Sequence, residues 1–142
     1  MRITRSGSVT WTGGLKDGKG AISTPSGALS GYPYGFASRF EGQAGSNPEE
    51  LLAAAHAACF TMSLTVALER AGFPATSLSS EAKVHLEFAD GAYSIPSIEL
   101  TVDAVVPGIG QAQFEEIAHL AERNCPVSKL FKADITLTPR LA

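Results

Sequence analysis

The chain has 142 residues, with 14 acidic and 11 basic side chains, a formal net charge of -3, and 44% hydrophobic against 18% charged residues. A chain of this length fits one hydrophobic core, so we expect a single domain over residues 1–142. The acidic balance leaves no basic footprint, which argues against nucleic acid or an anionic membrane surface as a partner. The first residues carry basic side chains without an apolar run behind them, so we predict no secretory signal and a cytoplasmic protein.

Three short segments near the N-terminus alternate between apolar and polar residues, at 8–14, 18–24 and 34–42. Alternation of this kind predicts β-strands, and the glycine-rich stretches at 13–20 and 27–35 read as turns between them. We therefore expect an N-terminal antiparallel sheet.

A long helix is predicted next, and both of its ends are marked. Asn47 is the expected N-cap, Pro48 has the preset φ of a first helical residue, and Glu50 completes a capping-box pattern. Gly72 is the expected stop. Residues 51–68 are apolar enough to raise the question of a membrane span, but polar residues interrupt them and charges flank them, so a buried helix is the better interpretation.

The second half of the chain alternates strands and helices. The pair Asp90-Gly91 between two apolar runs is a hairpin signal. An order of strands and helices of this kind places helices against antiparallel sheet, which is an α+β fold. The expected elements are strands at 79–90 and 93–108, helices at 111–124 and from Cys125 onward, and a strand at 134–139.

Cys59 lies in the apolar part of the long helix, between Ala58 and Phe60. Desolvation alone should raise the pKa of this thiol above about 8.5 and leave it inert, as a small buried hydrophobe. A cation near the sulfur is needed to make it reactive.

Cys125 precedes a proline at the predicted first turn of a helix, where unpaired backbone N–H groups favour a thiolate. The alternative is a thiol that serves as a poor N-cap. Two thiols on two helices suit a nucleophile and a resolving partner, because the first becomes a sulfenic acid and the second condenses with it. In a reducing compartment, such a disulfide is expected to be transient.

Other combinations of reactive residues give weaker evidence for a functional site. His56 and Cys59 share a helical face and offer two metal ligands, but zinc needs three or four and no CxxC or HxxxH supplies the rest. His85 and His119 read as surface or satisfied core residues. Neither a GxSxG elbow nor a P-loop lysine is present to support a hydrolase or a nucleotide site.

Four segments together resemble one known family: YGFASRFEG, NPEELLAAAHAACF, VPGI and CPVSKLFKADITL. Their order and spacing are similar to those of the osmotically inducible protein C (OsmC) family, within the OsmC/Ohr superfamily of thiol peroxidases that reduce organic hydroperoxides. The resemblance covers nearly the whole chain and is stronger to the OsmC branch than to the Ohr branch. It implies an intertwined homodimer, with antiparallel sheets around a long buried central helix and two active sites at the interface. It implies a role in oxidative and osmotic stress defence, and no metal, haem or flavin.

The resemblance also implies site residues. Cys59 matches the peroxidatic cysteine, Cys125 the resolving cysteine, Arg39 the activating guanidinium and Glu49 the carboxylate that orients it. A permanently charged guanidinium would stabilise the Cys59 thiolate and polarise the peroxide at once. From the residues alone, Arg39 also reads as a solvated strand residue paired with Glu41, and Glu49 as a first-turn carboxylate favoured by the helix dipole.

Helix geometry adds a condition on this site. Glu49 and Cys59 are ten positions apart, which is about 15 Å of rise and about 80° of rotation on a straight helix. One arginine head group cannot reach both, so we expect Arg39 and Glu49 of one subunit to act on Cys59 of the other.

The expected cycle begins with attack of the Cys59 thiolate on the distal peroxide oxygen, followed by a disulfide with Cys125. The resemblance implies a dithiol reductant, such as lipoyl groups on a carrier protein. Apolar neighbours such as Phe60 and Met62 are expected to line a pocket that favours alkyl hydroperoxides. Two alternatives stay open from the residues: a non-enzymatic binding protein in which the cysteines only pack, and a thiol redox sensor without fast turnover.

Overall fold

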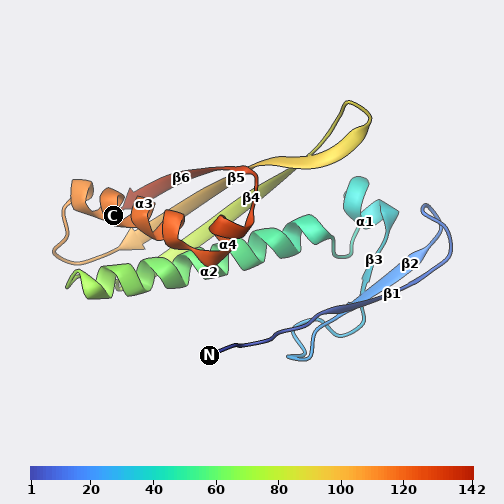
Figure 1. Ribbon diagram of the computed structural model, residues 1–142, viewed down its shortest axis with the longest axis horizontal. Helices are drawn as coiled ribbons and strands as arrows, with labels where there is room; N and C mark the ends of the chain where they lie inside the picture. The colour runs from blue at the N-terminus through green and yellow to red at the C-terminus, as the bar shows by residue number, and fades with distance from the viewer. The chain divides into compact units, whose positions relative to one another are not determined.

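The computed structural model describes residues 1–142 and contains two sheets of three strands each, together with four helices (Figure 1). Its internal contacts divide the chain into two units, Met1–Leu51 and Leu52–Ala142, and each is described by itself below. The single domain over residues 1–142 stays a prediction.

The first unit holds an antiparallel sheet of order β1-β2-β3, formed by β1 (Ser8–Thr12), β2 (Lys19–Ser23) and β3 (Tyr32–Tyr34). The first two strands are confirmed within the predicted segments. Trp11 and Tyr34 meet edge to face across β2, with ring centroids 5.6 Å apart. Gly20 lies between them, and a Cβ there would collide with the Tyr34 ring, so this glycine makes the aromatic contact possible.

The predicted strand at 34–42 is wrong. The third strand lies earlier, and Phe36–Phe40 form a short helix, α1. Hydrogen bonds of the Ser38 side chain favour a helical turn here over the strand that the alternating pattern predicted. The Ser38 Oγ accepts the Gly35 N–H at 2.9 Å and donates to the Ser46 carbonyl at 2.8 Å. The Phe36 and Phe40 rings, four positions apart, pack at 5.0 Å and support the turn.

The long helix α2 (Pro48–Arg70) begins and ends as predicted. Asn47 caps it, because its Oδ1 accepts the Glu50 N–H at 2.8 Å. At the other end Gly72 has φ +86°, its N–H bonds to the Glu69 carbonyl, and the Phe73 N–H bonds to the Leu68 carbonyl at 2.9 Å. This pair of bonds is a Schellman motif, which explains why the helix stops there.

The expectation that α2 is a buried helix holds for one stripe only. Of its 23 residues, four are fully buried, spaced every fourth position: His56, Phe60, Leu64 and Leu68. By length and composition alone α2 is apolar enough to cross a membrane, a test that core helices also pass. The three apolar members of the stripe belong to the hydrophobic core of the second unit, so we interpret α2 as a core helix with one uncovered face.

The second unit holds a sheet of order β4-β5-β6, formed by β4 (Ser77–Ala89), β5 (Ala92–Val105) and β6 (Asp134–Leu141). The predicted hairpin is confirmed: Asp90 and Gly91 have φ of 51° and 79°, the two positive values of a type I′ turn. The expectation of a wholly antiparallel sheet is wrong, because β6 pairs with β5 in parallel. A crossover through α3 (Gln111–Asn124) and α4 (Pro126–Leu130) returns the chain to make that parallel pair.

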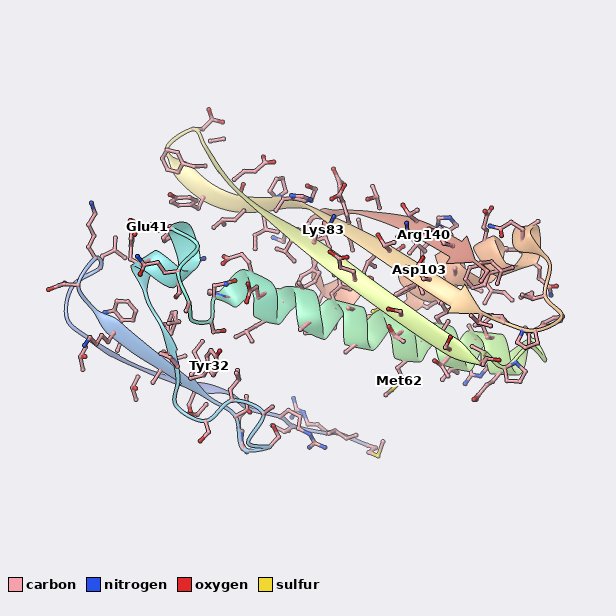
Figure 2. The ribbon with its side chains drawn as sticks, turned by 180° about the vertical axis from the view of Figure 1, so that it is seen from behind. Tyr32, Glu41, Met62, Lys83, Asp103 and Arg140 are labelled. Carbon is pink, nitrogen blue, oxygen red and sulfur yellow. The ribbon has the colours of Figure 1, made fainter.

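One face of this sheet carries the helices. Figure 1 shows α2, α3 and α4 beside the β4-β5-β6 sheet, and the even-numbered residues of β5 from Ile98 to Ala104 are buried. The other face is polar, and there Arg140 Nε on β6 bonds to Asp103 Oδ1 on β5 at 2.9 Å (Figure 2). The α+β class with helices on one sheet face is therefore confirmed. The core is formed by Phe60, Leu64, Leu68, Leu100, Val102, Ala104, Val106, Phe114, Ala118, Ala121 and Cys125.

Candidate active site

Arg39 and Glu49 form a close ion pair within the first unit. Glu49 Oε1 accepts hydrogen bonds from Arg39 Nη2 at 2.7 Å and from Nε at 3.2 Å, and Oε2 lies 3.3 Å from Nε. The Arg39 side chain is 35% exposed and that of Glu49 is 13% exposed. The interpretation of Arg39 as a strand residue paired with Glu41 is thus wrong. The Arg39 Nη1 group makes no hydrogen bond within the chain, so one edge of the guanidinium stays available.

The loop between α1 and α2 fixes the distance between these two residues. The Ser46 N–H donates to the Pro33 carbonyl at 2.9 Å, and Ser46 forms a bridge with Tyr34. Gly45 has φ +138°, and a Cβ there would lie 2.8 Å from Cβ of Ser38. Only glycine fits that close approach. Because the loop is tied at both ends, Arg39 on a five-residue helix faces a carboxylate on the first turn of α2.

Cys59 lies midway along α2 and is half-buried. Burial is the largest influence on its thiol and raises the pKa above its ordinary value. The neighbouring Cys125 thiol raises that pKa further, whereas the Val127 backbone N–H and the Ser63 hydroxyl hydrogen-bond to the sulfur and lower it. Within the chain the net effect favours the thiol, as the sequence predicted for Cys59 without a cation.

Cys125 is fully buried and is the N-cap of α4, with Pro126 at the first helical position. Its thiol is a neighbour of the Cys59 thiol, which packs against the core cluster that contains Cys125, and both cysteines are free. The structure therefore brings together two thiols that lie 66 positions apart in the sequence. The sequence prediction did not include Ser63 or the Val127 N–H among the groups that act on the Cys59 sulfur. The i, i+4 spacing of Cys59 and Ser63 on a helix was a usable signal, whereas a backbone donor leaves none in the sequence.

An apolar groove of about 640 Å³ opens beside Cys59. Met62, whose side chain is 72% exposed, points away from the sheet and lines this groove (Figure 2). Phe60, which was expected in this lining, is instead fully buried in the core, because its position puts it on the opposite stripe of α2. The groove is bounded by Cys59, Met62, Ser63, Val66, Ala67, Arg70, Ala71, Ile117, Leu120, Ala121, Asn124 and Pro126.

The histidines take three different positions. His56 is fully buried, and its Nε2 lies 2.7 Å from the Ser128 hydroxyl oxygen, while burial lowers its pKa. No cluster of three or more His, Cys, Asp or Glu side chains that could hold a metal is present anywhere in residues 1–142. His85 Nε2 lies 2.9 Å from Glu99 Oε2 on the sheet surface, and His119 is exposed on α3. None of the three therefore has the partners of a metal ligand.

Comparison with known proteins agrees with the resemblance drawn from the sequence. Peroxiredoxin OsmC of Escherichia coli (strain K12) is 48% identical over 141 residues, 99% of each chain. An organic hydroperoxide resistance protein of Xanthomonas axonopodis pv. citri (strain 306) is 32% identical over 100 residues, which is 69% of this chain and 68% of the relative. Among solved structures, the organic hydroperoxide resistance protein OhrB of Bacillus subtilis matches with a TM-score of 0.68 and 26% identity, over 96% of this chain and 98% of that one.

The family profile described as OsmC-like protein matches residues 40–140, which include both cysteines, Glu49 and the sheet of the second unit. The predicted family and the predicted class of enzyme are thereby confirmed. With this match and a peroxiredoxin relative over its full length, the chain belongs to the OsmC family of thiol peroxidases.

Proposed function

We propose that the chain reduces organic hydroperoxides to alcohols through a sulfenic acid on Cys59 and a disulfide between Cys59 and Cys125. The observation that carries this proposal is that the two free thiols are neighbours, one beside an open apolar groove and the other fully buried. A half-buried thiol can meet a peroxide, and a fully buried neighbour can meet only the oxidised product.

The atoms balance over two steps. The Cys59 thiolate attacks the distal oxygen of ROOH, the O–O bond breaks, and the alkoxide takes a proton and leaves as ROH. The Cys125 sulfur then attacks the sulfenic sulfur, an S–S bond forms, and hydroxide leaves with the thiol proton as water. Two electrons from each pair of thiols reduce one peroxide. An external dithiol must reopen the disulfide, and we propose a lipoyl-type dithiol for that step.

In this proposal Arg39, oriented by Glu49, supplies the cation that Cys59 lacks. Since the pKa of Cys59 is raised within the chain, a thiolate at neutral pH needs a positive charge beside it. Glu49 holds two nitrogens of the Arg39 guanidinium and leaves Nη1 without a partner, so that edge can face a thiolate and a peroxide oxygen. Because Glu49 and Cys59 lie ten positions apart on one helix, we assign this pair to the other subunit of a proposed dimer.

A homodimer is the proposed assembly. The face of α2 away from its buried stripe carries the exposed apolar side chains of Met62 and Val66. Apolar side chains on an unpaired face of a core helix fit burial against a second copy of the same helix. The two free thiols suit the reducing cytoplasm, where we place the protein.

The groove favours alkyl over inorganic peroxide in this proposal, because most of its lining is apolar. Burying an alkyl chain there gains about 25 cal/mol per Å² of apolar surface removed from water. Hydrogen peroxide offers no such surface.

The test of the function is consumption of tert-butyl hydroperoxide by the reduced protein with dihydrolipoamide. We expect turnover in the wild type, none in Cys59→Ser, and a Cys125→Ser variant that stops after one oxidation as a sulfenic or over-oxidised Cys59, identified by mass spectrometry. Equal rates in wild type and Cys59→Ser would reject the peroxidatic role. Oxidation of Cys59 without turnover would indicate a redox sensor, and no oxidation at all a binding protein.

The trans arrangement has its own test. A heterodimer is co-expressed with two tags, one subunit carrying Cys59→Ser and the other Arg39→Ala, and is purified through both tags. In a trans site the intact Cys59 meets the intact Arg39 of its partner, so about half the wild-type activity is expected because one of two sites survives. Activity no higher than that of the two separate homodimeric variants would show a site completed in cis.

A further inference from the structure

A buried histidine that the proposed cycle does not use lies beside the thiols. His56 is fully buried on α2, one helical turn before Cys59, and Ser128 is buried on α4, three residues after Cys125. The His56 Nε2 and the Ser128 Oγ are 2.7 Å apart. This hydrogen bond therefore joins the two thiol-bearing helices at points three residues from each thiol.

Stability alone does not account for a histidine at this position. Its Nδ1 is buried with no hydrogen-bond partner, so one ring nitrogen stays unsatisfied. The other members of its stripe are Phe60, Leu64 and Leu68, and an apolar residue at position 56 would continue the stripe without an unsatisfied atom. The bond to Ser128 must therefore serve a purpose other than filling the core.

The helix α4 needs an external anchor. It has five residues, and its N-cap Cys125 makes no side-chain capping bond, so it gains little from its own backbone. His56 holds it on two sides: the hydroxyl of Ser128 bonds to its ring, and Phe131 packs edge-on against the ring with centroids 5.2 Å apart. Both contacts fix α4 against α2.

We propose that His56 and Ser128 are positioning residues that set α4 against α2 so that the Cys125 sulfur meets the sulfenic sulfur on Cys59. This inference rests on the proposed peroxidase cycle. A disulfide forms only within a narrow range of Cβ–Cβ distances and dihedral angles, so a small displacement of α4 slows that step steeply. In the step, the Cys125 sulfur bonds to the Cys59 sulfur, the Cys59 S–O bond breaks, and hydroxide leaves with the Cys125 proton as water.

The first oxidation depends less on this hydrogen bond. The Cys59 sulfur and the Ser63 hydroxyl that acts on it both lie on α2 itself, whereas the Val127 N–H and the Cys125 thiol belong to the anchored segment. A loosened α4 should therefore affect the disulfide-forming step more than the attack on peroxide. A uniform loss of stability would not produce that separation.

Variants of both partners test the proposal. Ser128→Ala removes the hydroxyl with little change of volume, and His56→Leu removes the ring. His56→Gln is the rescue, because the glutamine amide nitrogen can take the place of Nε2. A matched control is Ser80→Ala, which removes the 2.7 Å bond between Thr61 and Ser80 that joins the same helix to β4 instead of α4. A cooperative unfolding transition in urea is measured for each variant to show that it is folded before urea is added.

The measurement follows one equivalent of tert-butyl hydroperoxide mixed with reduced protein. Quenching at set times with dimedone, which traps sulfenic acid, and reading the products by mass spectrometry gives the rates of sulfenic acid formation and disulfide formation separately. In Ser128→Ala and His56→Leu we expect disulfide formation to slow about tenfold and the first step to change by less, with more sulfinic acid on Cys59 in excess peroxide. In His56→Gln and Ser80→Ala we expect both rates near those of the wild type.

The outcomes separate this inference from the function beneath it. Disulfide formation at the wild-type rate in both Ser128→Ala and His56→Leu would overturn the positioning role and leave the peroxidase cycle intact. An equal slowing in Ser80→Ala would overturn it too, as a general effect of loosening α2. A wild type that forms no sulfenic acid on Cys59 would overturn both.

Discussion

Cys59 and Cys125 are held by different means, and the difference suits the two roles proposed for them. Cys59 is part of a 23-residue helix whose N-terminal cap and Schellman stop are both formed, so its sulfur has a rigid base. Cys125 begins a helix of five residues, and its placement depends on groups elsewhere in the fold. A nucleophile on a rigid helix, with a second thiol held beside it by contacts from outside its own short helix, permits attack on a peroxide first and disulfide formation afterwards.

At the residue scale, His56 makes stability depend on pH. Burial lowers its folded pKa below the unfolded value of about 6.5, so the unfolded chain binds a proton that the folded chain refuses. The stability that a neutral His56 preserves is present above about pH 6.5 and is lost as the pH falls toward the folded pKa. We therefore predict that the free energy of unfolding decreases as the pH falls below about 6.5, by at most about 1.4 kcal/mol per pH unit for one proton.

Urea unfolding of the wild type and of His56→Gln at a series of pH values checks this prediction. The glutamine variant should lose the part of the pH slope that belongs to position 56 and keep the hydrogen bond to Ser128. The same slope in both proteins would assign the pH dependence to groups other than His56.

At the scale of single elements, the C-terminal stop of α2 depends on one residue. Gly72 has φ +86°, which a side chain resists, while a Cβ at that position would meet no atom within 4 Å. The cost of Gly72→Ala is therefore backbone strain without a clash, and we predict a loss of about 1 kcal/mol in the free energy of unfolding. Chemical denaturation measures it, and Gly91→Ala, at φ +79° in the hairpin with open space around it, is the matched comparison.

Local sequence signals predicted the ends of α2 and the β4-β5 hairpin correctly, but they did not predict α1 or the parallel β5-β6 pair. Asn47 and Gly72 mark the ends of α2, and Asp90-Gly91 marks the hairpin, because each acts within a few residues of the chain. The helix α1 was missed since Ser38 bonds to Ser46, eight positions away, and the parallel β5-β6 pair depends on a crossover whose direction no local pattern encodes.

The candidate site, too, depends on contacts between residues far apart in the sequence, which local patterns do not predict. The pair of cysteines was proposed from the residues, whereas the family resemblance assigned their separate roles and added Arg39 and Glu49. All four roles stay proposals. The bond between His56 and Ser128 joins residues 72 positions apart, and a lone histidine in an apolar helix gave no sign of a partner on another element.

At the scale of the whole molecule, the exposed apolar face of α2 has a testable consequence. Met62 is 72% exposed, and a second copy of the chain packed there would bury it. We predict that Met62→Glu shifts the protein from dimer to monomer, because a charge would have to be desolvated at the interface. Light scattering after size exclusion reports the mass. Lys83→Glu, a charge change on the exposed polar face of the sheet, is the control that should leave the mass unchanged.

The contact of Trp11 and Tyr34 over Gly20 gives the protein an intrinsic optical label. Trp11 is the only tryptophan in the chain, and it belongs to the first of the two compact units. Its emission on selective excitation therefore reports the state of the N-terminal sheet alone, whereas the helical circular dichroism comes mainly from α2 and α3. Two spectroscopic signals from one unmodified sample can thus show whether the two units melt as one cooperative body or in sequence.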